Sequence, residues 1–204
     1  MSLKWNRPAG SLSATLILAH GAGAPMDSPF MERIAELLAA QGIAVARFEF
    51  PYMAQRREDG RKRPPNPQAQ LLDCWRRVHA QVRETLGGKS MGGRMASLLA
   101  DELGADALVC LGYPFYAAGK PEKPRVAHLA GLRTPTLIVQ GERDALGNRE
   151  AVAGYALAPT IRLHWLAAAD HDLKPLKASG LTHEQHLAAT AREVAGFLRG
   201  LQGH

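Results

Sequence analysis

The chain has 204 residues, of which 46% are hydrophobic and 22% are charged, the balance of an ordinary globular protein. This length fits one domain, which we expect to span residues 1–204. No apolar run approaches the roughly 18 residues that a membrane span needs, and no signal-peptide core follows the N-terminus. We therefore expect a cytoplasmic protein that does not enter a membrane.

The formal net charge is +6, and the chain has 2 cysteines, Cys74 and Cys110. Much of the positive excess falls in one segment, residues 56–63. A single basic loop without interleaved aromatic residues is a weak signal for nucleic acid, so a solvated loop is the simpler interpretation and nucleic acid is not an expected partner. The cysteines are too few for a disulfide framework and lack metal-ligand spacing, so we expect packed, reduced thiols and no metal site.

Strand-like and helix-like segments alternate along the chain, which predicts an α/β fold with a mostly parallel central sheet and helices on both faces. The apolar run 14–20 predicts a strand that is covered on both faces. The helix after it is expected to be capped by Ser28, with Pro29 in its first position, and to stop at Gly42. Residues 43–50 predict the next strand.

The polar, basic and proline-rich stretch 53–67 predicts a loop. A helix is expected from about Gln68 into the low eighties, and another directly after Ser90. Thr182 with Gln185 forms a capping-box pattern that opens the last helix. The remaining buried strands are expected at 107–111, 136–140 and 161–166.

The sharpest signal for chemistry is Gly88-Lys89-Ser90-Met91-Gly92, which fits the nucleophile-elbow pattern G-x-S-x-G. In such an elbow the serine lies on a strained turn between a strand and a helix, and the glycines leave no side chain to obstruct that turn. The hydroxyl then lies at the helix N-terminus, where free backbone N–H groups stabilise developing negative charge. A phosphate-binding P-loop is excluded because that motif needs glycine where this chain has Arg83.

The strand that must lead into this elbow is poorly marked. In the stretch 82–87 only Val82 and Leu86 are strongly apolar, and the preceding helix runs almost into it. Either that helix ends early, or the sequence lacks several residues at this junction. A missing strand would put the placement of Ser90 in doubt.

A nucleophilic serine needs a base, and the base needs an acid that orients it. Asp144 directly follows the strand 136–140, and His171 follows the strand 161–166. This is the chain order of serine, acid and histidine that an elbow of this kind requires. A turn-forming aspartate and a surface histidine are the plain alternatives for each residue alone, but both residues in order behind Ser90 favour a catalytic triad.

The glycine-rich turn His20-Gly21-Ala22-Gly23 follows the first strong strand, so its backbone N–H groups can approach a substrate oxygen. We expect the N–H groups of Ala22 and Met91 to form the oxyanion hole, where loss of one donor typically costs about 2.7–4 kcal/mol of transition-state stabilisation. His20, which ends the strand, is expected to be structural. Lys89 and Tyr113 are the expected substrate contacts.

Together these motifs resemble the α/β-hydrolase superfamily, and in particular the branch that contains testis-expressed protein 30 and subunit 3 of the NSL chromatin complex, near the dienelactone hydrolases. Nearly the whole chain takes part in the resemblance. The matching segments are 19–24, 50–53, 60–65, 87–94 and 112–114, together with Asp144 and His171. The resemblance implies an α/β-hydrolase fold and a serine hydrolase that uses Ser90, Asp144 and His171, but for the branch it implies no established substrate.

Caps in this fold lie between the strands 107–111 and 136–140, and that interval is too short for a lid domain. An open site favours a small or accessible carboxylic ester or thioester, cleaved through an acyl-enzyme without a metal or organic cofactor.

The main alternative is a non-catalytic interaction module that retains the fold, since fold alone does not establish activity. A third interpretation, nucleic-acid binding through the basic segment, predicts binding that weakens steeply with salt.

Overall fold

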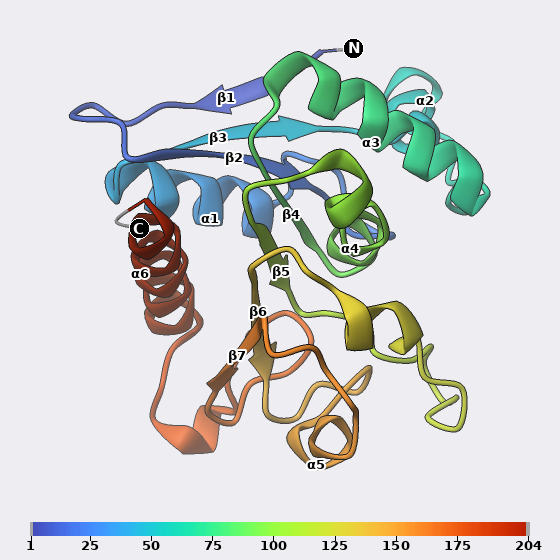
Figure 1. Ribbon diagram of the computed structural model, residues 1–204, viewed down its shortest axis with the longest axis vertical. Coiled ribbons are helices and arrows are strands. Elements are labelled where there is room, and N and C mark those ends of the chain that lie inside the picture. Colours follow the sequence, from blue (N-terminus) through green and yellow to red (C-terminus); the bar gives the residue numbers. More distant parts are fainter. Residues whose placement is uncertain (1, 203–204) are drawn as a thin grey trace.

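The computed structural model describes residues 2–202, and its centre is a seven-stranded sheet (Figure 1). The strand order is β1-β3-β2-β4-β5-β6-β7. β1 pairs with β3 in antiparallel orientation and every other neighbouring pair is parallel, so the expected mostly parallel sheet is confirmed. The strands are β1 (Lys4–Asn6), β2 (Ala14–Ala19), β3 (Ile43–Phe48), β4 (Thr85–Lys89), β5 (Leu108–Leu111), β6 (Thr136–Gly141) and β7 (Ile161–Leu166).

Helices cover both faces of this sheet. They are α1 (Pro29–Ala40), α2 (Pro51–Asp59), α3 (Gln68–Val82), α4 (Met91–Leu103), α5 (Arg149–Ala153) and α6 (His183–Leu201). α1 packs against α6 on one face, and α3 packs against α4 on the other (Figure 1). The side chains of β2 alternate between the two layers: Leu16 and Leu18 join the α1–α6 core, whereas Ile17 and Ala19 join the α3–α4 core. This alternation fixes the register, because a slip by one residue would exchange the faces.

Local signals set the helix ends as expected. The Ser28 hydroxyl accepts a hydrogen bond from the Met31 N–H and caps α1. Thr182 and Gln185 form both hydrogen bonds of a capping box at the start of α6. Each cap satisfies backbone N–H groups that the helix itself leaves unpaired, and a cap typically contributes about 1 kcal/mol.

The expectation of a loop over residues 53–67 is wrong for its first half, because α2 covers Pro51–Asp59. A proline occupies the first turn, and Gly60 ends the helix in the left-handed conformation (φ 72°). Tyr52 and Met53 are buried. Arg56, Arg57 and Glu58, which precede Asp59 and Gly60, are good helix formers, although their polarity is also typical of a loop.

The weakly marked strand before Ser90 is present. α3 ends at Val82, Arg83 adopts the left-handed conformation (φ 50°), and β4 begins two residues later. The helix therefore ends in the low eighties, as expected, and a strand that is shorter and begins later than the stretch 82–87 forms without additional residues. β4 contains few apolar residues because its neighbours approach closely: a Cβ on Gly87 would lie 2.8 Å from Leu16 Cδ1 and 2.9 Å from the Val109 carbonyl oxygen.

Residues 112–135 connect β5 to β6 and, within the described residues 2–202, contain no helix longer than a short 3-10 turn at Ala127–Gly131. This connection is too short to form a separate cap domain over the carboxyl ends of the strands. No helix in the part of the chain that the structure describes is long and apolar enough to cross a membrane.

Gly92 of α4 is expected to tolerate no side chain. A Cβ there would lie 2.5 Å from the His20 carbonyl oxygen and 2.7 Å from Ala19 Cβ, because α4 approaches the end of β2 closely. Gly92→Ala should therefore lower the free energy of unfolding by about 1–3 kcal/mol through overpacking, measured by denaturant titration.

Gly196→Ala in α6 is the matched control, since nothing lies within 4 Å of a Cβ at that helical position. There the substitution should raise the free energy of unfolding by about 0.5–1 kcal/mol, the usual gain of alanine over glycine in a helix. A Gly92→Ala protein as stable as the wild type would contradict the close contact between α4 and β2.

Candidate active site

Ser90 lies between β4 and α4 in a strained backbone conformation (φ 50°, ψ −118°). The turn leaves no room for neighbouring side chains, since a Cβ on Gly88 would lie 2.3 Å from the Gly93 nitrogen. The Ser90 N–H donates to the Leu111 carbonyl oxygen at 2.9 Å, which ties the turn to β5. The surrounding sheet and helix hold this strain, which is the geometry expected of a nucleophile elbow.

All of the predicted triad residues meet at this end of the sheet. His171 Nε2 lies 2.8 Å from Ser90 Oγ, and His171 Nδ1 lies 2.8 Å from Asp144 Oδ2. Asp144 follows β6 and is fully buried, whereas His171 lies on the loop after β7 with 25% of its side chain exposed. With Nδ1–H donating to the carboxylate, Nε2 is the atom that can accept the serine proton.

Gln140, which the sequence analysis did not single out, orients Asp144. Its Nε2 donates to Asp144 Oδ2 at 2.9 Å, and its Oε1 accepts from the Tyr113 N–H at 2.8 Å. The Leu146 N–H donates to the other carboxylate oxygen, Oδ1, at 2.7 Å. Gln140 could have been identified from the sequence as a polar residue inside the apolar run 136–140. A buried amide needs hydrogen-bond partners, so its presence there indicates a polar network.

Ala22 and Met91, the predicted oxyanion donors, both line a cavity beside the candidate nucleophile. Met91 is the first residue of α4, so its N–H has no partner within the helix. His20 has the expected structural geometry: its Nε2 accepts from the Phe50 N–H at 3.1 Å, and its Nδ1 donates to the Gly21 carbonyl oxygen at 2.6 Å. Burial lowers the pKa of His20, which keeps the ring neutral in this arrangement.

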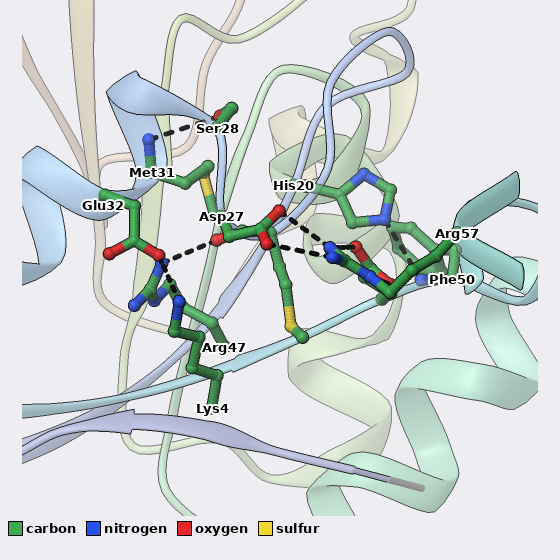
Figure 2. A network of polar contacts seen from close by, with 11 residues as sticks. Lys4, His20, Asp27, Ser28, Met31, Glu32, Arg47, Phe50 and Arg57 are labelled. Atoms are coloured by element: carbon green, nitrogen blue, oxygen red, sulfur yellow. Dashed lines mark hydrogen bonds and ion pairs between the residues drawn. The ribbon is translucent and has the colours of Figure 1, made fainter. Parts of the chain in front are cut away.

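A network of charged side chains holds the loop between the glycine-rich turn and α1 (Figure 2). Arg47 of β3 is fully buried, and its Nη1 donates to the Met26 carbonyl oxygen at 2.7 Å and to Glu32 at 2.9 Å. Lys4 also pairs with Glu32, at 2.5 Å. Met26 lies three residues after Gly23, so this contact connects the loop that follows the glycine-rich turn to β3.

The basic segment 56–63 is only partly a solvated loop. Arg57 lies in α2 and pairs with Asp27 (Figure 2), at 2.7 Å, and with Glu49, at 2.6 Å. Arg63 pairs with the aspartate four residues before it. Contacts within the fold therefore neutralise part of the positive charge that a nucleic-acid backbone would need.

Two cavities meet at Ser90, and Ala22 and Leu146 line both of them. The first, called the Arg94 cavity, has a volume of about 410 Å³ and also contacts Arg94, Arg125 and Met91. The second, called the His171 cavity, has a volume of about 440 Å³ and also contacts His171, Lys89 and Phe30. Each is large enough for a short acyl or alcohol group.

Tyr113 does not have the substrate contact that was predicted for it. It is fully buried and lines neither cavity. Its hydroxyl donates to the Arg125 carbonyl oxygen at 3.2 Å, and its ring packs edge-on against Phe115. The prediction is wrong because the loop after β5 turns this side chain into the core.

Lys89, the other predicted substrate contact, lines the His171 cavity, but its ammonium group binds other residues of the protein. Its Nζ donates to the His171 carbonyl oxygen at 2.8 Å and lies 3.4 Å from Asp172. Burial lowers the pKa of the Lys89 ammonium group, because the low-polarity surroundings disfavour its charge. These contacts hold the loop that carries His171 against the turn at Ser90.

Lys89→Met should lower kcat for an ester substrate by about 10- to 100-fold with little change in KM, because the histidine loop loses its anchor and the proton acceptor is misplaced. Lys174→Met, an exposed lysine on the same loop, is the matched control. An increase in KM without a change in kcat would show instead that Lys89 contacts the substrate.

The comparisons with known proteins agree with this fold. Residues 12–199 match the alpha/beta hydrolase domain family, so the chain belongs to this family. Among solved structures, the esterase domain of a Rhodothermus marinus protein is 19% identical with a TM-score of 0.69, covering 97% of this chain and 92% of that one. Est1E from Butyrivibrio proteoclasticus with ferulic acid bound is 16% identical with a TM-score of 0.71, covering 100% and 96%.

A dienelactone hydrolase from Anabaena variabilis is 22% identical with a TM-score of 0.66, covering 97% of this chain and 91% of that one. At these identities the likenesses show a shared fold. The family membership and the fold together define the class of this protein, an α/β-hydrolase.

Proposed function

We propose that the protein is a serine hydrolase that cleaves a small or accessible carboxylic ester or thioester through an acyl-enzyme on Ser90. The observation that carries the proposal is the continuous chain of hydrogen-bond distances, 2.8 Å from Ser90 Oγ to His171 Nε2 and 2.8 Å from His171 Nδ1 to Asp144. A buried carboxylate, an imidazole and a hydroxyl in this order are the groups that acyl transfer requires.

In the proposed reaction His171 Nε2 takes the Ser90 proton while Oγ attacks the carbonyl carbon. The oxyanion that forms is stabilised by the N–H group of Met91, at the N-terminus of α4, and by that of Ala22, in the turn after β2. The imidazolium then gives its proton to the departing oxygen or sulfur as that bond breaks. Water repeats the sequence on the acyl-enzyme and releases the acid, with Asp144 holding the imidazole tautomer throughout.

A fluorophosphonate probe tests the nucleophile directly. We expect one probe molecule to label Ser90 in each protein molecule, with no labelling in Ser90→Ala and slower labelling in His171→Ala. A panel of short acyl esters and thioesters with one leaving group would then rank substrates; feruloyl esters belong in it because a neighbour of the same fold holds ferulic acid. A native, folded protein that never labels would favour the non-catalytic interaction module.

Within the family, we place the chain in the branch of testis-expressed protein 30 and NSL complex subunit 3, on the strength of the segments 19–24, 50–53 and 87–94. We propose a cytoplasmic location and a small-molecule ester-like substrate as the partner, rather than nucleic acid. Binding of a DNA duplex with an affinity that falls steeply as the salt concentration rises would contradict the proposal that nucleic acid is not a partner.

A further inference from the structure

Arg94 places a positive charge beside the candidate nucleophile. It lies one helical turn after Ser90, with its N–H donating to the Ser90 carbonyl oxygen at 3.0 Å, and it lines the Arg94 cavity. Its Nε is buried and has no hydrogen-bond partner, and no carboxylate of residues 2–202 forms an ion pair with it. A buried donor of this kind is costly unless something pairs with it.

Arg125 reinforces this charge from another part of the chain. It lines the same cavity from the β5–β6 connection, anchored by its N–H to the Phe115 carbonyl oxygen at 2.6 Å. Within the described chain it too forms no ion pair. Burial lowers the pKa of Arg94, and the charge of Arg125 lowers it further. By contrast, the buried Arg47 is paired with Glu32.

The remainder of the Arg94 cavity is largely apolar. Leu71, Met95, Pro114 and Tyr116 contribute to its walls. A ligand that complements the cavity therefore carries a short aliphatic stem and an anionic end. A carboxylate suits the planar fork of a guanidinium group, which can donate two parallel hydrogen bonds to it.

The position of His171 decides which part of a substrate enters this cavity. His171 must hand its proton to the leaving group, and it lines the second cavity but not the Arg94 cavity. The leaving group therefore belongs in the His171 cavity. With the leaving group in the His171 cavity, the acyl chain takes the other cavity at Ser90, the Arg94 cavity.

We propose that Arg94 and Arg125 select an acyl group that ends in a carboxylate, so that the substrate is a half-ester or half-thioester of a short dicarboxylic acid. This inference rests on the proposed function, because it names the substrate class of the same site. Hydrolysis at Ser90 would release the dicarboxylate and the alcohol or thiol, with water as the only co-reactant.

The test compares two aryl esters with the same leaving group: the half-ester of glutaric acid, and the 5-methylhexanoate, which replaces the carboxylate by an uncharged group of similar shape. We expect the wild type to favour the half-ester by at least about tenfold in kcat/KM, the effect of one charged hydrogen bond. Arg94→Gln and the exposed Arg125→Gln should each lower this preference about tenfold or more. Arg192→Gln, the same charge change at an exposed position on α6, should leave it unchanged.

Binding of glutarate to the Ser90→Ala protein, measured by calorimetry, separates the two proposals. Binding that is lost on adding Arg94→Gln supports the anion site even if no ester is hydrolysed, in which case only the proposed hydrolase function fails. Equal kcat/KM values for the two esters in the wild type, the same ratio in both arginine variants, and no glutarate binding would together overturn the dicarboxylate proposal and leave the hydrolase function standing.

Discussion

Ser90→Ala should lower kcat for an activated ester by about 10⁶-fold, and His171→Ala should cause a loss of similar size. The double variant should be no slower than either single variant, because the serine is a weak nucleophile until the imidazole removes its proton. Removing either partner of the 2.8 Å contact therefore abolishes the same step. Binding and the oxyanion donors would supply what residual catalysis remains.

The measurement is burst and steady-state kinetics on purified variants, with thermal unfolding as the check that each is folded. Ser11→Ala, an exposed serine far along the chain from the elbow, is the control for the loss of a hydroxyl. Losses that multiply in the double variant would mean that Ser90 and His171 act independently, which the proposed mechanism does not allow.

Asp144→Asn should lower kcat by about 10⁴-fold while leaving the fold intact. Each oxygen of this buried carboxylate accepts hydrogen bonds: Oδ2 from His171 and Gln140, and Oδ1 from the Leu146 N–H. An amide has only one oxygen, so in either orientation its NH₂ group faces a donor. If the NH₂ group faces His171, the ring takes the other tautomer and Nε2 carries a proton that prevents it from acting as the base.

The measurement that decides this prediction is the tautomer of His171 in Asp144→Asn, which nitrogen NMR of a protein with isotope-labelled histidine reports. The loss of a buried acceptor should also lower the free energy of unfolding by about 1–3 kcal/mol. Asp73→Asn, at an exposed position on α3, is the control and should change neither quantity. An Asp144→Asn enzyme with near-normal kcat would remove Asp144 from the proposed mechanism.

Several features could be predicted from the sequence because they depend on residues close together in the chain. The glycines around Ser90, the cap at Ser28 and the capping box at Thr182 are each set by sterics or hydrogen bonds within a few residues. The alternation of apolar strands with helices likewise predicted the mostly parallel sheet. The weak strand at Thr85–Lys89 was harder to identify, since it is buried by the close approach of neighbouring strands rather than by its own apolar side chains.

What the sequence alone determined is the list of chemical groups and the chain order in which they follow the strands. Only the tertiary structure decided which of them meet: Ser90 and His171 are 81 residues apart in the chain, and the parallel strands bring them to hydrogen-bond distance. It also turned Tyr113 into the core and placed Arg94 and Arg125 around one cavity. The physical reason is that side-chain environment depends on contacts between distant segments, which local patterns of polarity do not encode.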